Sequence, residues 1–244
     1  MEKRPLIIAL EGIDGSGKSV QLLRLEANLV KAGFSVKILD FPCYDSFFGR
    51  EIGRLLSGDG DVTAADLDVR SMSLWYAMDR VKAFGALDAS GTDVILLNRS
   101  TMANAAYQGS RVQIAAMKKG EDPQAALEDY IKWLFELEFV ILGIPEPDIF
   151  LIFDVPVGTS RKNVAKKGRR EYVGGEKADV YEKDTMLLET VRHGYITCAA
   201  MFPGSRTVAC TGDDGEMRSV ESISAEVSFI VFAAVGNAGD RPPV

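Results

Sequence analysis

The sequence predicts an α/β fold in which a five-stranded parallel sheet carries helices on both faces. Two observations predict it: short apolar runs alternate with longer helical patterns, and polar clusters follow the ends of the apolar runs. The 244 residues, of which 47% are hydrophobic, suffice for one large domain. We therefore expect a single domain over residues 1–235 and a disordered tail over residues 236–244, with ligands at the carboxyl ends of the strands.

The first third of the chain predicts two strands and a helix between them. Residues 6–10 read Leu-Ile-Ile-Ala-Leu, an uninterrupted apolar run of strand length. A glycine loop follows, and then a helix whose leucines recur on one face until Gly33 ends it. The next apolar run predicts a strand over residues 35–41, which Pro42 ends because proline breaks a strand ladder.

The middle of the chain is expected to be mostly helical. A short helix over residues 48–56 leads through a loose glycine-containing turn into a long helix over residues 63–89. Residues 93–97 form the third expected strand, and a helix over residues 104–113 follows it. Proline is favoured in the first turn of a helix, so another helix is expected over residues 123–142.

In the last third of the chain, expected strands and helices alternate again. The apolar run at residues 148–155 predicts the fourth strand, followed by a short helix and the charged stretch 166–177. A helix over residues 179–201, a fifth strand over residues 206–210 and a last helix over residues 220–235 complete the expected domain.

The strongest motif lies between the first strand and the first helix, and it reads Gly12-Ile13-Asp14-Gly15-Ser16-Gly17-Lys18-Ser19. A G-x-x-x-x-G-K-S sequence in this context is typical of a P-loop, because its glycines let backbone N–H groups approach a phosphate chain. We expect Lys18 to reach the β- and γ-phosphates of ATP and Ser19 to coordinate Mg²⁺. The residues expected to bind the nucleotide are Gly12, Asp14, Gly15, Ser16, Gly17, Lys18, Ser19 and Val20. A glycine-rich turn without a ligand is the alternative.

Net charge, cysteine content and the length of the apolar runs exclude several classes of protein. A formal net charge of −7 argues against general nucleic-acid binding, and three cysteines without metal-ligand spacing indicate reduced thiols. Residues 1–4 lead straight into the first strand, so we expect no signal peptide. The apolar run at residues 227–235 is too short to span a bilayer. We therefore expect a cytoplasmic protein with no membrane partner.

Five segments in the same order resemble the thymidylate kinase family, over about residues 6–231. They are Glu11-Gly12-Ile13-Asp14-Gly15, Phe41-Pro42-Cys43-Tyr44, Asp79-Arg80, Asn98-Arg99 with the following Asn104-Ala105-Ala106-Tyr107-Gln108-Gly109, and Asp179-Val180-Tyr181-Glu182. The resemblance implies a P-loop NTPase fold with a basic lid that transfers the γ-phosphate of ATP to dTMP, giving dTDP and ADP with Mg²⁺ as cofactor. It also implies a homodimer packed through the helices that bear Trp75 and Trp133.

The resemblance further implies which side chains meet dTMP. Tyr76 would stack on thymine, Arg80 would hydrogen-bond the base, and Tyr107 would crowd a ribose 2′-hydroxyl. Asn104 and Gln108 share a helical face and could read a base edge or the sugar. The expected substrate-binding residues are Asp14, Phe41, Tyr44, Arg50, Tyr76, Arg80, Asn98, Arg99, Asn104, Tyr107, Gln108 and Tyr181. The open alternatives are core packing for Tyr76, a surface ion pair for Arg80 and a surface position for either amide.

Basic residues are expected on the phosphates, because guanidinium groups match phosphate geometry. Six of the ten residues 161–170 are basic, and they belong to an expected lid over about residues 161–177. Gly15 stands where some family members carry a catalytic arginine, so the lid would supply it. The expected catalytic residues are Lys18, Arg99, Arg161, Arg169 and Arg170. A solvated charged loop is the alternative for this stretch.

Asn98 departs from the aspartate that many relatives carry at this point near the metal. Because the second pKa of a phosphate monoester is about 6, the acceptor is largely deprotonated at neutral pH and needs no general base. We expect Asp14 and Glu182 to compensate, with Ser19 as the third metal-binding residue. Two alternatives stay open: a kinase for another nucleoside monophosphate or deoxynucleoside, and a nucleotide-binding protein that has lost phosphotransfer.

Overall fold

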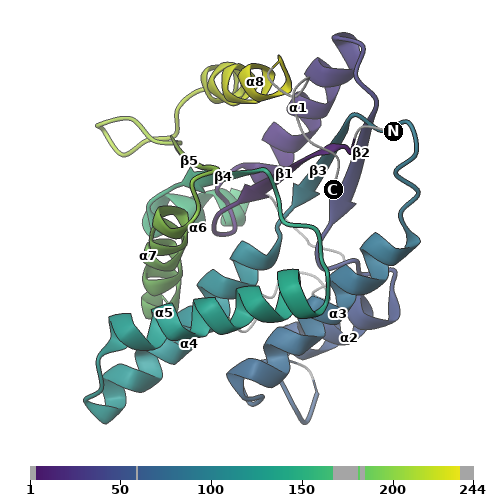
Figure 1. Cartoon of the computed structure of the whole chain (residues 1–244). Helices are drawn as coiled ribbons and strands as arrows, with labels where there is room; N and C mark the ends of the chain where they lie inside the picture. The colour runs from purple at the N-terminus through teal and green to yellow at the C-terminus, as the bar shows by residue number, and fades with distance from the viewer. Residues whose placement is uncertain (1–3, 59, 167–180, 182–184, 237–244) are drawn as a thin grey trace.

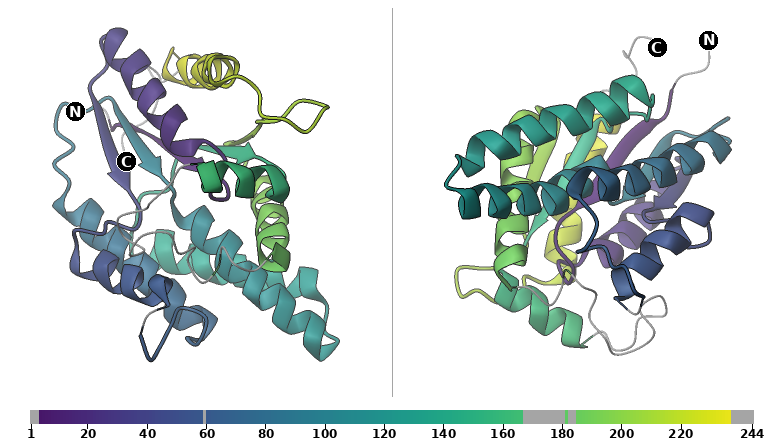
Figure 2. Two further views of the ribbon diagram at one scale, coloured as in Figure 1. Left: turned by 180° about the vertical axis from the view of Figure 1, so that it is seen from behind. Right: turned by 90° about the horizontal axis from the view of Figure 1, so that it is seen from below.

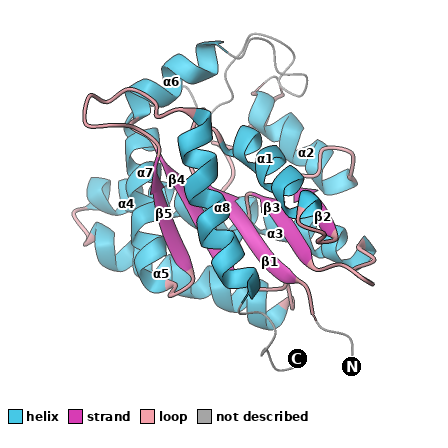
Figure 3. Cartoon of the chain, turned by 90° about the horizontal axis from the view of Figure 1, so that it is seen from above, coloured by secondary structure: helices cyan, strands magenta, loops and turns pink. Residues whose placement is uncertain are grey.

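The structure, a computed structural model, describes residues 4–58, 60–166, 181 and 185–236 (Figure 1). Within these residues, the strands are β1 (Leu6–Glu11), β2 (Val36–Asp40), β3 (Val94–Asn98), β4 (Ile149–Asp154) and β5 (Ser205–Ala209). They form one sheet in the order β2-β3-β1-β4-β5, and every pair is parallel (Figure 3). The predicted five-stranded parallel sheet is therefore confirmed.

Helices cover both faces of this sheet. In the described residues they are α1 (Lys18–Lys31), α2 (Phe47–Ser57), α3 (Val69–Ala86), α4 (Thr101–Lys119), α5 (Pro123–Phe135), the π-helix η1 (Glu136–Ile141), α6 (Val157–Lys166), α7 (Thr185–Met201) and α8 (Val220–Gly236). Seen from behind and from below, α2 to α5 lie together on the side opposite α1 and α8 (Figure 2). None of the described helices is long and apolar enough to cross a membrane.

Successive side chains of β1 point to opposite faces of the sheet, so the strand contributes to a hydrophobic core on each face. Ile7 and Ala9 pack into the core beneath α2 to α5 and α7, whereas Ile8 and Leu10 pack beneath α1 and α8. All four are buried. Because the strand is covered on both faces, it reads as a continuous apolar run rather than as an alternating one.

Several predicted boundaries are corrected by capping contacts. The expected helix over residues 63–89 is the shorter α3, because Asp68 caps its first turn by accepting a hydrogen bond from the Ser71 N–H at 3.0 Å. The helix expected over residues 104–113 is the longer α4, which the Ser100 hydroxyl caps and left-handed Gly120 ends.

The helix expected over residues 123–142 changes character at its end. It is α-helical as α5 and continues as η1, where the wider turn places Glu138 inside the protein with none of its side chain exposed. The helix expected from residue 179 is described from Thr185 onward as α7, and its expected first residues lie outside the described part of the chain, as does the expected tail from residue 237.

The sheet register brings three polar strand ends together. Asn98, the last residue of β3, is in register with Leu10 of β1 on one side and with Asp40 of β2 on the other. The P-loop leaves β1 at the same edge. The carboxyl ends of β1, β2 and β3 therefore frame one place for a ligand, as the strand pattern predicts.

Candidate active site

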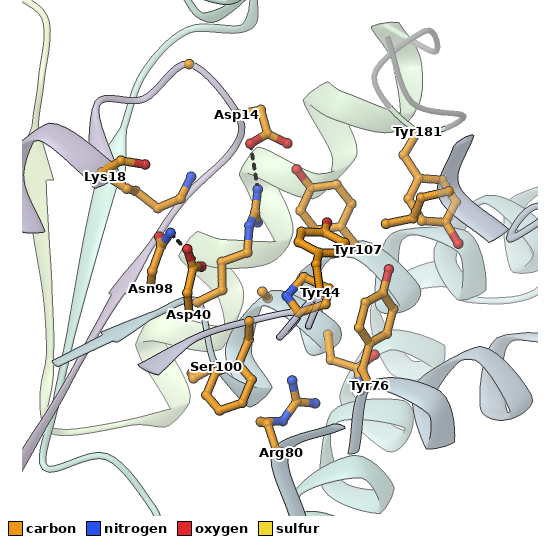
Figure 4. A pocket seen from close by; sticks show the side chains of 18 of the residues that line it. Asp14, Lys18, Asp40, Tyr44, Tyr76, Arg80, Asn98, Ser100, Tyr107 and Tyr181 are labelled. Atoms are coloured by element: carbon orange, nitrogen blue, oxygen red, sulfur yellow. Dashed lines mark hydrogen bonds and ion pairs between the residues drawn. The ribbon is translucent and has the colours of Figure 1, made fainter. Parts of the chain in front are cut away.

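A cavity of about 310 Å³ opens at this edge (Figure 4). Its lining residues are Asp14, Gly15, Gly17, Lys18, Ser19, Asp40, Phe41, Pro42, Tyr44, Leu56, Tyr76, Arg80, Asn98, Arg99, Ser100, Ala103, Asn104, Tyr107 and Tyr181. Most residues predicted from the sequence are in this set. Figure 4 shows Lys18 and Asn98 on one side of the pocket and Tyr76 and Tyr181 on the other.

The glycine loop adopts a conformation that only glycine adopts without strain. Gly12, Gly15 and Gly17 have φ angles of 133°, 79° and 94°. A side chain at Gly12 would stand 2.6 Å from the Phe153 carbonyl oxygen, and one at Gly15 would collide with the backbone of Ser160. The loop can therefore approach β4 and α6 closely because these positions lack a Cβ atom.

The loop presents positive charge and N–H donors to the cavity. The buried Lys18 ammonium donates to the carbonyl oxygens of Gly12 and Ile13 at 2.8 and 2.9 Å. At the start of α1, Gly17 provides no side-chain cap, and the first turn holds no acidic residue. The first N–H groups of a helix are free to bind an anion when no side chain accepts from them.

Arg99 connects the loop to the helices beside the cavity. Its backbone is left-handed, with φ of 68°, and its guanidinium donates to the Asp14 carboxylate at 2.9 Å and to the Tyr195 hydroxyl at 3.3 Å. The guanidinium carbon also lies 5.3 Å from the centre of the Tyr107 ring. One cation thus fixes Asp14 relative to α4 and α7.

Asp40 is a cavity residue that the sequence prediction missed. The Asn98 side-chain amide donates to its carboxylate at 2.8 Å across the paired strand ends. Burial raises the pKa of Asp40, while the Asn98 hydrogen bond and the cations Arg99 and Lys18 act in the opposite direction. Its position near the end of the strand expected over residues 35–41 was the signal that could have identified it.

Glu11 lies beneath the cavity and is completely buried. One carboxylate oxygen accepts a hydrogen bond from the Ser100 hydroxyl at 2.6 Å. Burial raises the pKa of Glu11, against the lowering effects of Ser100, Arg99 and Lys18. Glu11 therefore links the end of β1 to the start of α4 beneath the P-loop.

The far end of the cavity is lined by α3 and α4, and η1 contacts both helices through Glu138. Arg80 is buried there and donates to Glu138 through Nε at 2.7 Å and Nη2 at 2.5 Å, so the alternative of a surface ion pair is wrong. Asp79 instead accepts from the backbone N–H of Cys43 and from the Ser46 hydroxyl, both at 2.7 Å. This pair of contacts ties α3 to the loop after β2.

Aromatic rings form the wall next to this end. Tyr107 lies 6.1 Å from Tyr181 and 6.5 Å from Tyr195, measured between ring centres. Gln108 is buried and donates to the Tyr181 hydroxyl at 3.2 Å, so the alternative that places it on the surface is wrong. It lies behind the wall, outside the set of residues that line the cavity.

Some predicted residues are placed elsewhere. Arg50 is exposed, and its guanidinium donates to the Asp45 carbonyl oxygen at 2.7 Å rather than lining the cavity. Arg161 is exposed on α6, where it donates to the Thr185 hydroxyl at 2.6 Å. The other predicted residues outside the cavity lining are Gly12, Ser16 and Val20. Arg169, Arg170 and Glu182 lie outside the described residues.

The helix α6 nevertheless rests directly on the P-loop. The Ser160 hydroxyl donates to the Asp14 carbonyl oxygen at 2.5 Å, and the Asn163 amide donates to the Gly15 carbonyl oxygen at 2.9 Å. The first residues of the expected lid are therefore anchored on the glycine loop. Because the contact requires a glycine at position 15, an arginine could not stand there without displacing α6.

Comparisons with known proteins agree on one family. The family model described as thymidylate kinase matches residues 10–210 of the chain. The thymidylate kinase of Mycobacterium tuberculosis is 30% identical over 212 residues, covering 85% of this chain and 92% of that protein. The probable thymidylate kinase of Pyrococcus horikoshii is 27% identical, covering 93% and 96% respectively.

A solved structure of thymidylate kinase from Candida albicans superposes with a TM-score of 0.67 over 98% of this chain and 95% of that one. Its sequence is 19% identical, so the likeness concerns the fold.

Proposed function

The chain belongs to the thymidylate kinase family, and we propose that it transfers the γ-phosphate of ATP to dTMP, giving dTDP and ADP. The observation that supports this proposal most strongly is that P-loop residues line one end of the cavity, and aromatic and amide side chains line the other end of the same cavity. Lys18 and Ser19 line it where a phosphate chain would lie, and Tyr76 and Asn104 line it where a base would lie. A phosphoryl donor and a nucleotide acceptor would thus meet in one enclosed space.

The P-loop residues fit ATP and Mg²⁺. The left-handed glycines and the start of α1 offer N–H donors to phosphate oxygens, and Lys18 adds a cation. Asp14 and Ser19 are hard oxygen donors that line the same cavity. Mg²⁺ would take its remaining ligands from phosphates and water, as this ion commonly does. Bound Mg²⁺ supplies charge neutralisation at the transferring phosphoryl group.

The chain's own residues would then position the reactants and balance charge. Lys18 would bind the transferred phosphoryl group, and Arg99, held by Asp14, would bind the acceptor phosphate together with Tyr44. No general base is required, because a phosphate monoester with a second pKa of about 6 is already an anion at neutral pH.

The same proposal assigns the nucleoside contacts. Tyr76 stacks on the base, and Arg80 and Asn104 contact its edge from the end of the cavity. Tyr107 would stand against the sugar, where its ring would crowd a 2′-hydroxyl, and Tyr181 lies beside it in the same wall. Asp14 lines the same cavity and would contact the 3′-hydroxyl and help to hold the metal.

We further propose that the active form is a cytoplasmic homodimer packed through the helices α3 and α5. Apolar surface supports this: Leu74 of α3 and Phe47 of α2 are 43% and 59% exposed, and the rings of Phe47 and Trp75 are 6.4 Å apart. The catalytic arginine would come from the lid, with Arg161, Arg169 and Arg170 as candidates, because α6 occupies the space beside Gly15.

A coupled ADP-release assay tests the proposal. Mg-ATP is supplied with dTMP, dUMP, UMP, dCMP or thymidine in turn, and turnover is compared. Preferred turnover of dTMP is expected, and Lys18→Ala should lower it by orders of magnitude with an unchanged far-ultraviolet circular dichroism spectrum. Preferred turnover of another acceptor would replace dTMP in the proposal. Binding of ATP and dTMP without turnover would instead indicate a nucleotide-binding protein.

A further inference from the structure

Glu138 of η1 is a buried carboxylate that connects η1 with α3 and α4 at the far end of the cavity. We call this the base end, because the proposed function places the thymine base there. One of its oxygens accepts from Arg80 Nε at 2.7 Å and from the Thr101 hydroxyl at 2.6 Å. The other accepts from Arg80 Nη2 at 2.5 Å and from the Asn104 amide at 3.1 Å. The side chain is fully buried, so protein groups replace the water that a carboxylate would otherwise bind.

These contacts determine which way the Asn104 amide points. A carboxylate that already holds Arg80 accepts hydrogen bonds and donates none, so the NH₂ group of Asn104 must face it. The second NH₂ hydrogen is donated to the Ser73 carbonyl oxygen, with a nitrogen to oxygen distance of 3.2 Å. The Asn104 carbonyl oxygen is buried and has no hydrogen-bond partner among the described residues. Because Asn104 lines the cavity, this oxygen is the acceptor that its side chain can offer to a ligand.

The base end therefore has a fixed arrangement of hydrogen-bond donors and acceptors, which we call its polarity. Arg80 can only donate, whereas Asn104 is held so that it accepts. Thymine and uracil present the complementary edge, because O4 accepts and N3–H donates. Cytosine presents the opposite one, with a 4-amino donor and an N3 acceptor. In this pocket the cytosine 4-amino donor would face the Arg80 donor, and the cytosine N3 acceptor would face the Asn104 carbonyl oxygen, so neither pair could form a hydrogen bond.

We propose that Glu138 is a positioning residue that fixes this polarity and thereby selects pyrimidines with a 4-keto group and an N3–H over cytosine. The inference rests on the proposed function, since it concerns the acceptor end of the same site. Each buried polar group left without a partner lowers kcat/KM by about 10- to 100-fold. Two mismatched groups should therefore separate dTMP from dCMP by about 100-fold or more in the wild type.

The test is a competition between dTMP and dCMP in one reaction with Mg-ATP, for the wild type and for Glu138→Gln. Glutamine keeps the size of the side chain but replaces one acceptor oxygen with an NH₂ group, so the Asn104 amide is no longer held in one orientation. The ratio of the two kcat/KM values should fall at least 10-fold. Because both substrates meet the same enzyme molecules, a partly unfolded preparation does not change the ratio.

Tyr130→Phe is the matched control. It removes another buried hydrogen bond in this layer, the 2.6 Å contact between the Tyr130 and Ser73 hydroxyls, and leaves the donors and acceptors at the cavity unchanged. Its ratio should equal that of the wild type. Calorimetric titration of dTMP and dCMP without ATP should give the same order of binding preferences.

The outcomes separate the two proposals. A wild type that does not phosphorylate dTMP overturns the proposed function. A wild type that prefers dTMP, with an unchanged ratio in Glu138→Gln or an equal fall in Tyr130→Phe, overturns only the role of Glu138. Should the glutamine variant not fold, Glu138→Asp replaces it. The shorter carboxylate withdraws from Asn104, and an unchanged ratio there refutes the inference equally.

Discussion

Asn98→Asp places a second carboxylate against Asp40 at the paired ends of β2 and β3. In the wild type the Asn98 amide donates to Asp40 at 2.8 Å. A hydrogen bond to a charged acceptor contributes about 1.5–3 kcal/mol to stability, and the substitution removes this donor. Two carboxylates about 4 Å apart repel by about 1 kcal/mol in water and about 4 kcal/mol at an effective dielectric constant of 20. The lower part of this range applies, because Asp40 is only partly buried in the open cavity and solvent still screens its charge.

Proton uptake limits this cost and makes it depend on pH. A proton shared between the two carboxyl groups restores a donor and acceptor pair, so the pKa of the pair is raised above the unfolded value of about 4. Burial already raises the pKa of Asp40, and loss of the Asn98 donor acts in the same direction. Between pH 4 and the raised pKa the folded state binds more protons than the unfolded state, so the free energy of unfolding falls as pH rises.

We therefore expect Asn98→Asp to lose about 1 kcal/mol at pH 5 and about 2–4 kcal/mol at pH 8. Urea unfolding at both pH values measures this. The exchange variant Asp40→Asn/Asn98→Asp again holds one amide and one carboxylate, so most of the loss should be recovered. An Asn98→Asp variant as stable as the wild type at pH 8, or an exchange variant no better than the single one, would refute the reasoning.

Two further substitutions test the loop and the aromatic wall. Gly15→Ala should lower the free energy of unfolding by more than the ~1–3 kcal/mol expected for backbone strain, because its Cβ meets Ser160. Gly91→Ala, at φ of 63° in open space, is its control in urea unfolding, and equal losses would contradict the contact with α6. Tyr107→Ala should raise the kcat/KM for ribonucleotide acceptors relative to dTMP about 10-fold or more, whereas Tyr107→Phe should not. Unchanged ribose acceptance in the alanine variant would exclude the steric role.

The order of elements and the place of the site could be predicted from the sequence because both depend on local patterns. Apolar runs identify strands buried on both faces, and a P-loop requires a strand before it and a helix after it. Strand ends in a parallel sheet then meet at one edge. The same argument could have placed Asp40 in the site, since it is the last residue of β2 and lies beside Asn98. It lies just before the Phe41-Pro42-Cys43-Tyr44 segment, so no motif marks it as a site residue.

Glu138 could not have been predicted in this way. It lies 58 residues from Arg80, within a stretch that reads as the end of an amphipathic helix, where a glutamate is normally solvated. Its burial depends on the π-helical turn and on the packing of η1 against the base end, neither of which has a local sequence pattern. The start of α3 was expected too early for a similar reason, since Thr63 and Asp68 are both suitable caps by sequence and tertiary context chooses between them.

The contacts of the P-loop have a consequence for the synthesis of the chain. The loop is complete once residue 19 has been made, but Arg99 binds it from 85 residues later, and the Ser160 hydroxyl from 146 residues later. The central strand β1 likewise waits for β3 and β4 before both of its edges are paired. Contacts between distant segments form slowly, and a growing chain supplies these partners in order from the N-terminus. We therefore expect nucleotide binding to begin only after residue 160 has left the ribosome, because shorter nascent chains lack these contacts to the loop.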